Sequence, residues 1–142
     1  MRYILFLFFI VPSLILKGQN TPVIGSMLKK SGNVLRVRVV EELPDKNVAG
    51  PVLVEVVEVY KSKTFHVGDR IAVRMQPFSI TDDSAKVNHL SKGNELIVFL
   101  KKEDPKTYNR SGQLFPYYDL YDEWCGWIFF NERLGEMLKK NK

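Results

Sequence analysis

Alternation of apolar and charged side chains is the feature of this sequence that most restricts its fold. In residues 33–43, NVLRVRVVEEL, apolar residues alternate with two arginines. Residues 69–75, DRIAVRM, repeat the pattern, with Arg70 and Arg74 between apolar positions. A period of two places the apolar side chains on one face of an extended strand. The pattern therefore predicts two strands, each with one buried face and one face towards solvent.

Three further stretches are expected to form strands. In residues 51–63, PVLVEVVEVYKSK, the alternation changes phase after Val56. This indicates either a β-bulge near Val56–Val57 or a strand buried on both faces near its middle. Residues 95–102 are apolar on both faces, which is typical of a central strand. A fifth strand is expected at residues 114–121.

The C-terminal segment changes to the period of a helix. Its apolar residues recur on one helical face: Phe130, Leu134, Met137 and Leu138. Asn131 is expected to cap a helix over residues 131–140. A helix of about ten residues does not form alone in water, so we expect it to pack against the strands.

The order of these elements predicts the fold class. Five strands, a long connection at residues 76–94 and a final helix indicate a mainly β protein. We expect a five-stranded OB-like Greek-key barrel with a C-terminal α-helix. It would occupy residues 33–142 as a single domain, after a polar lead-in at residues 19–32.

The N-terminus is typical of a secretory signal peptide at residues 1–18. Arg2 precedes an apolar run from Tyr3 to Leu16, which is shorter than the roughly 20 residues that cross a bilayer as a helix. An uncleaved membrane anchor is the alternative. The signal peptide predicts a periplasmic or secreted protein without stable membrane insertion after cleavage.

Charge and cysteine content restrict the partners and the chemistry. The chain carries a net charge of +5, which falls to +3 when Arg2 and Lys17 leave with the signal peptide. The lysines fall at expected turns and ends rather than in a dense stripe, so we expect no nucleic-acid partner. Cys125 is the only cysteine, so the domain has no internal disulfide, and we expect the thiol to be buried. The oligomeric state stays open.

Two segments resemble a known family. VLVEVVEVYKSKTFHVGDRIAVRM, followed by LSKGNELIVFL, is similar to the netrin-like modules, whose fold is shared with the tissue inhibitors of metalloproteinases. The resemblance covers residues 33–101 and implies a barrel scaffold of exported proteins that contacts other proteins. Its structural positions are Gly68, Asp69 and Gly93 in turns before strands, and Lys61, whose stem would cross the mouth of the barrel.

The sequence departs from the animal inhibitors in its cysteines. Those inhibitors chelate the protease metal through a cysteine at the mature N-terminus, whereas no cysteine precedes Cys125 here. The disulfides of the family are missing as well. The resemblance therefore implies a bacterial-type exported version without disulfides, and metalloproteinase inhibition by that mechanism does not carry over.

No arrangement typical of an enzyme occurs in the sequence. His66 and His89 are the only histidines, and neither has the neighbours of a zinc site or of a cysteine nucleophile. A glycine-rich phosphate loop is also missing. We therefore expect no enzymatic activity, no cofactor and no metal, and both histidines exposed.

Residues 115–130 concentrate aromatic side chains near the C-terminus. The candidate contact residues are Tyr117, Tyr118, Tyr121 and Trp124, together with Lys61. They could form a platform for a partner, or they could close the barrel and seat the final helix. The predicted function is an exported, non-catalytic module that contacts another protein in the cell envelope or outside the cell. The alternative is a carbohydrate- or small-ligand-binding protein that uses residues 117–127.

Overall fold

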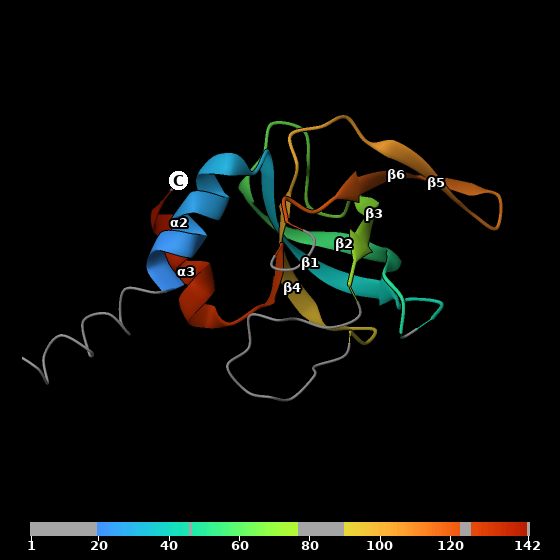
Figure 1. Cartoon of the computed structure of the whole chain (residues 1–142), viewed down its shortest axis with the longest axis horizontal. Helices are drawn as coiled ribbons and strands as arrows, with labels where there is room; N and C mark the ends of the chain where they lie inside the picture. Colours follow the sequence, from blue (N-terminus) through green and yellow to red (C-terminus); the bar gives the residue numbers. More distant parts are fainter. Residues whose placement is uncertain (1–19, 46, 77–89, 123–125, 142) are drawn as a thin grey trace, which may run out of the picture. The chain divides into compact units, whose positions relative to one another are not determined.

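The structure of the chain is a computed structural model (Figure 1) that describes residues 20–45, 47–76, 90–122 and 126–141. The chain divides into two compact units, Met1–Lys30 and Ser31–Lys142. The expected signal peptide lies outside the described residues, and so do His89, Trp124 and Cys125.

The first unit contributes one described element, helix α2 (Asn20–Lys30). A helix therefore occupies most of the expected polar lead-in. Pro22 lies in its first turn, where the missing N–H breaks no helical hydrogen bond. Lys29 and Lys30 lie in its last turn, where the helix dipole favours positive charge. Within the part of the chain that is described, no helix is long and apolar enough to cross a membrane.

The second unit is mainly β with a helix at its C-terminal end, as the sequence pattern predicts. The strands are β1 (Asn33–Glu41), β2 (Gly50–Lys61), β3 (Arg70–Met75), β4 (Glu95–Leu100), β5 (Lys106–Arg110), β6 (Gln113–Asp119) and β7 (Trp127–Phe129). Helix α3 (Glu132–Lys140) follows them.

All seven strands belong to one mixed sheet. Its order is β5-β6-β3-β2-β1-β4-β7, with β3 and β6 parallel and the other neighbouring pairs antiparallel. Since β5 and β7 lie at the two edges, this order is open rather than closed. The prediction of five strands is wrong, because the sequence pattern reveals neither β5 nor β7.

These two strands lack the signals that reveal the others. β5 reads KTYNR, and none of its side chains is fully buried, so no alternation of apolar and polar residues marks it. Ser111 and Gly112, both with positive φ, form the two-residue turn to β6. The polar composition of residues 103–113 is typical of a loop and gives no indication of a strand. β7 has three residues, too few to show a period of two.

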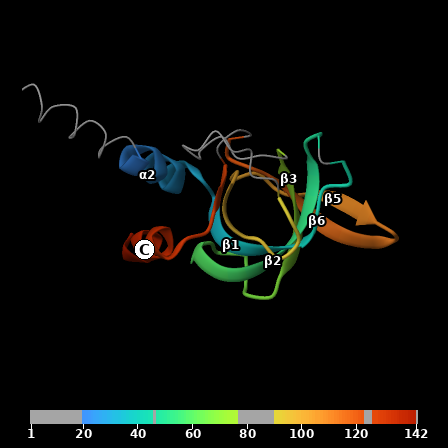
Figure 2. The ribbon, with the colours of Figure 1, turned by 90° about the horizontal axis from the view of Figure 1, so that it is seen from below.

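The end of β4 also contacts the end of β6. One isolated bridge joins Leu100 to Leu120. Beside it, the Lys101 amide donates to the Asp119 carbonyl at 3.0 Å, and the Tyr121 amide donates to the Phe99 carbonyl at 2.7 Å. Three strands separate β4 from β6 in the sheet order. The ends of β4 and β6 nevertheless meet, because β1 and β2 curve strongly between them (Figure 2).

One face of the sheet carries the main hydrophobic core. The residues expected on the inner face of β1 and β3 are all buried in it: Leu35, Val37, Val39, Ile71, Val73 and Met75. Arg38, Arg70 and Arg74 are exposed on the opposite face, which confirms the predicted alternation. Trp127 of β7 joins the same core and is 1% exposed.

Strand β2 contains a bulge at the expected position. Arg36 of β1 lies opposite Glu58, whereas the next residue, Val37, lies opposite Val56. Val57 is therefore the extra residue. The bulge restores the alternation after the phase change and bends the strand.

Helix α3 begins at the expected cap. The Asn131 side chain accepts a hydrogen bond from the Leu134 amide at 2.9 Å. Gly135 is buried, and a Cβ atom there would lie 2.8 Å from the Phe130 ring and 3.2 Å from the Tyr60 hydroxyl of β2. Glycine therefore permits the close approach of α3 to β2, although it is a weak helix former.

We expect Gly135→Ala to destabilise the protein by about 1 kcal/mol. The gain in helix propensity is about 1 kcal/mol, but forcing a methyl group against Phe130 and Tyr60 costs ~1–3 kcal/mol. Urea unfolding followed by circular dichroism measures the difference. Glu136→Ala, at the exposed next position, is the control and should change the free energy of unfolding by less than about 0.5 kcal/mol. An unchanged or more stable Gly135→Ala protein would contradict this account of the packing.

Candidate functional site

The glycines and the aspartate of the netrin-like resemblance lie in turns. Gly68 and Gly93 have φ values of +96° and +88°, which side chains other than glycine rarely adopt. Asp69 accepts a hydrogen bond from the His66 amide at 2.8 Å, the local contact expected from its position before β3. These residues shape the ends of strands.

Lys61 lies at the C-terminal end of β2, opposite Val34 of β1. Its ammonium group donates a hydrogen bond to the Ser31 carbonyl at 2.9 Å. The predicted tyrosines lie on and after β6, and β3 separates β6 from β2 in the sheet. The structure therefore does not place Lys61 and the tyrosines on neighbouring strands.

Tyr117 and Tyr118 lie on opposite faces of β6. Tyr117 packs with the small cluster formed by Leu53, Ala72 and Phe115, whereas Tyr118 packs against the main core. Both are half-buried, and burial raises the pKa of each phenol, so both stay protonated at neutral pH. Because adjacent residues of a strand point in opposite directions, these two tyrosines do not form one platform.

Tyr121 is half-buried after the end of β6, and Trp124 lies outside the described residues. The structure thus describes three of the four predicted aromatic contact residues. Tyr118 meets the ring of Phe65 edge to face at 5.0 Å between centroids. Tyr117 lies 6.0 Å from the ring of Tyr108 on β5. The partly buried tyrosines therefore fasten β6 to its neighbours on both faces.

β5 and β6 form a hairpin that projects away from the rest of the sheet (Figures 1 and 2). One hairpin face is held down by Tyr108, Phe115 and Tyr117, which pack with the small cluster on β2 and β3. Near the turn, Arg110 forms an ion pair with Glu41 at the end of β1. The projecting hairpin is therefore anchored at both its base and its tip.

The other face of the hairpin is open to solvent. It carries Leu114, whose exposed fraction is 64%, and the exposed Thr107, Asn109 and Pro116. In the part of the chain that is described, β5 pairs only with β6, so its outer edge has no strand beside it. An anchored hairpin with an open edge and an exposed leucine is a candidate contact surface.

A second candidate surface surrounds Asp119 at the base of the hairpin. We call the set of Arg74, Lys101, Lys106, Tyr117 and Asp119 the Asp119 cluster. Arg74 lies beside Asp119 in the parallel β3–β6 pair, and the Lys106 ammonium lies 3.9 Å from the Asp119 carboxylate. Two adjoining shallow depressions share Lys101 and Asp119 as lining residues.

No pattern in the sequence indicates this cluster. Its members come from three strands and a loop that are up to 45 positions apart in sequence. Lys101 and Lys106 belong to a lysine-rich stretch that is interpreted from sequence as solvated charge. Arg74 is correctly expected to face outward. The parallel pairing of β3 with β6 brings these residues together, and the local sequence pattern does not predict it.

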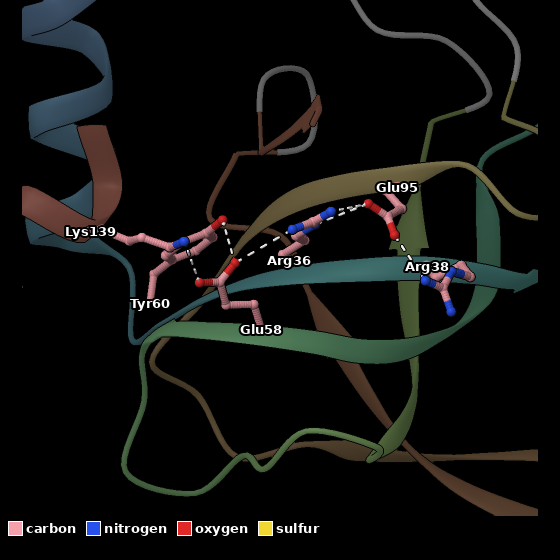
Figure 3. Close-up of polar contacts among 6 residues, drawn as sticks. All are labelled: Arg36, Arg38, Glu58, Tyr60, Glu95 and Lys139. Carbon is pink, nitrogen blue, oxygen red and sulfur yellow. Dashed lines mark hydrogen bonds and ion pairs between the residues drawn. The ribbon is translucent and has the colours of Figure 1, made fainter. Parts of the chain in front are cut away.

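A second polar group, formed by six residues of β1, β2, β4 and α3, is internally paired (Figure 3). Arg36 Nε donates to Glu95 Oε2 at 3.0 Å, and Arg38 donates to the other oxygen of Glu95 at 3.0 Å. Arg36 also lies 3.6 Å from the Glu58 carboxylate. Arg36 on β1 thus contacts both Glu58 on β2 and Glu95 on β4, and Glu95 also contacts Arg38.

The same chain of contacts reaches α3. Glu58 accepts a hydrogen bond from the Tyr60 hydroxyl and forms an ion pair with Lys139, both at 3.2 Å. The Arg36 guanidinium also lies over the Phe130 ring, 3.6 Å from its centroid. A cation over an aromatic ring is attracted to it. These contacts attach the start and the last turn of α3 to the outer face of the sheet.

The environment of this group shifts its ionisation. Hydrogen bonding by Arg36, assisted by Arg38, lowers the pKa of Glu95, although burial opposes the shift. Burial and the charge of Glu58 raise the pKa of Tyr60 to about 12. Both shifts favour the states that make the contacts: an ionised Glu95 and a protonated Tyr60. The network is therefore already satisfied, and we assign it to stability rather than to ligand binding.

No metal centre is evident in the described part of the chain. It contains no group of three or more His, Cys, Asp or Glu side chains that could hold a metal ion. His66 has an 85% exposed side chain, as expected from the sequence.

Comparison with protein-family models, with curated proteins and with solved structures gives no significant match.

We expect acid to reduce the contribution of Glu95 to stability. Because folding lowers its pKa, the ion pairs stabilise the fold above the unfolded value of roughly 4.3, and this stabilisation is lost as the pH falls through the folded value. Glu95→Gln should lower the free energy of unfolding by about 1–2 kcal/mol near neutral pH, and by progressively less as the pH falls through the lowered pKa of Glu95.

Urea unfolding of both proteins across this pH range measures the effect. Glu136→Gln, which removes an exposed carboxylate of α3, serves as the control and should follow the wild-type curve. Equal losses of stability in the Glu95→Gln protein at neutral and acidic pH would argue against the ionic role of Glu95.

Proposed function

We propose that this chain is an exported, non-catalytic binding module that contacts another protein through the β5–β6 hairpin. The observation that carries the proposal is the open outer edge of β5 on a hairpin that is packed on its other face. Such an edge can accept a further strand, because no described strand pairs with its outward backbone N–H and C=O groups.

The register of the hairpin identifies the groups on this edge. Thr107 lies opposite Pro116, which has no N–H to donate. In antiparallel strands, hydrogen-bonded and non-hydrogen-bonded pairs alternate, so the Thr107–Pro116 pair is of the second kind. The N–H and C=O groups of Thr107 and Asn109 therefore point away from β6, towards an incoming strand.

The charges of β5 do not protect this edge. Lysine and arginine on an edge strand usually discourage a further strand from pairing. Here Lys106 is directed to Asp119 and Arg110 to Glu41, both by ion pairs within the domain. Leu114 on the open face then offers apolar contact area to a side chain of the added strand.

A sugar-binding platform has less support. Stacking of sugars requires aromatic rings that share an exposed face, whereas Tyr117 and Tyr118 pack on opposite sides of β6. Protein contact is therefore the function we favour over carbohydrate or small-ligand binding by residues 117–127.

For the fold, we propose an OB-type barrel built from β1, β2, β3, β4 and β6, with β5 and β7 as additions. The parallel β3–β6 pair and the antiparallel β1–β4 pair support this proposal. The Leu100–Leu120 bridge supports closure between β4 and β6. The netrin-like family remains a proposal that rests on the sequence resemblance.

We expect Thr107→Pro to weaken partner binding at least about tenfold, which is about 1.4 kcal/mol. Proline removes the outward N–H group, and an edge strand tolerates it. Thr107→Val is the matched control, since it keeps the N–H group and a β-branched side chain. Leu114→Asp should also weaken binding, whereas Val67→Asp, at an equally exposed valine outside the hairpin, should not.

The measurement is affinity capture from cell-envelope extract with quantification of the retained proteins, followed by titration of the retained protein. The idea fails if the wild-type chain retains no specific protein. It also fails if Thr107→Pro and Thr107→Val bind that protein equally well.

Export is the second part of the proposal, and it rests on residues 1–18. We expect the protein recovered from periplasm or medium to begin near Gln19, as measured by mass spectrometry. Phe8→Lys places a charge in the apolar run and should leave the chain unprocessed. Full-length wild-type protein in the cytosolic fraction, with Met1 or Arg2 at its start, would contradict the proposal.

A further inference from the structure

Two cationic groups of the Asp119 cluster have no partner among the residues that the structure describes. Within the described ranges, neither the Arg74 guanidinium nor the Lys101 ammonium group makes a hydrogen bond or an ion pair. Lys106, by contrast, lies 3.9 Å from the Asp119 carboxylate. Lys106 offsets the charge of Asp119, whereas Arg74 and Lys101 are two further positive charges beside it. Glu103 and Asp104 line the adjoining depression, not the one that Arg74 and Lys101 share.

The strand register places these groups on one face. Arg74 and Asp119 are neighbours in the parallel β3–β6 pair, and the Lys101 amide donates to the Asp119 carbonyl. Asp119 therefore lies between the other two. Residues Met75 and Leu120, which follow Arg74 and Asp119 in sequence, point the other way into the main core.

The surroundings favour an anion at this position. Arg74 and Lys101 both line the same depression. Burial raises the pKa of Tyr117, so its hydroxyl is protonated and able to donate a hydrogen bond, and the charge of Arg74 acts on this residue. Tyr117 and the acidic Asp104 both line the adjoining depression, and Asp104 does not line the one that holds Arg74.

We propose that Arg74 and Lys101 form a binding site for a single oxyanion, the carboxylate or phosphate group of a small ligand. The guanidinium group provides a planar pair of N–H donors that matches two oxygens of such a group, and the lysine adds a second charge. Because the depression is shallow, it holds the charged group and leaves the rest of the ligand in solvent. This site is independent of strand addition at β5.

Titration of the full chain with inorganic phosphate and, separately, with acetate tests the proposal. Ionic strength is held constant with chloride, since screening alone weakens surface charges. Binding is followed by the arginine Nε–H signals in NMR spectra and by calorimetry. We expect saturable binding of at least one of the two anions, with a shift of the Arg74 signal, and the stronger arm identifies the preferred oxyanion.

Variants with matched controls locate the site. Arg74→Gln and Lys101→Gln should each weaken binding at least about tenfold. Arg70→Gln removes the same charge from the same strand, where the guanidinium is paired with Glu55 at 3.3 Å, and should leave the affinity unchanged. Lys102→Gln is the corresponding control for Lys101.

Three results would overturn the proposal: no saturable binding of either anion, equal loss of affinity in the matched controls, or unchanged affinity in both site variants. Thermal unfolding of each variant verifies that it is folded. Leu114→Asp should retain wild-type anion affinity, so failure of the hairpin proposal and failure of this one are distinguishable.

Discussion

The parallel pairing of β3 with β6 is the constraint on which both candidate surfaces depend. It is the only parallel pair among the described strands, and it requires the chain to pass through β4 before β6 returns beside β3. The pairing holds β6 and therefore its hairpin partner β5 on the sheet. It also places Asp119 beside Arg74, and the exit from β4 places Lys101 beside Asp119. Without this pair, neither the projecting hairpin nor the Asp119 cluster would exist.

The outer face of the sheet combines two polar groups with different energetics. Around Arg36 and Glu95, each charge has an opposite charge or a hydrogen bond, so the cost of partial burial is offset within the protein. Around Asp119, Arg74 and Lys101 have no such compensation from described residues. A network of paired charges stabilises the fold, whereas unpaired positive charges gain new favourable interactions when an anion binds. This difference is our reason for assigning stability to the first group and binding to the second.

The inner core is the part of the fold that the sequence predicts well. Alternating apolar positions identify β1 and β3 and their buried faces, and a phase change identifies the bulge in β2, because burial on one face acts directly on local composition. The cap at Asn131 is equally local. β5 is missed because both faces of a projecting hairpin meet solvent or only a small cluster, so burial imposes no period on it. β7 is missed because three residues cannot show a period.

The candidate site is less predictable from the sequence because it depends on contacts between distant strands. The sequence draws attention to Tyr117 and Tyr118 as aromatic residues, but their alternation along β6 directs them to opposite faces. The hairpin surface depends on Thr107 lying opposite Pro116, and the Asp119 cluster depends on Arg74 lying beside Asp119. Both arrangements are set by the register of the strands. Register is fixed by turn geometry and by the burial of neighbouring strands together. Residue type therefore draws attention to β6, whereas the strand pairing determines which of the neighbouring residues are exposed beside it.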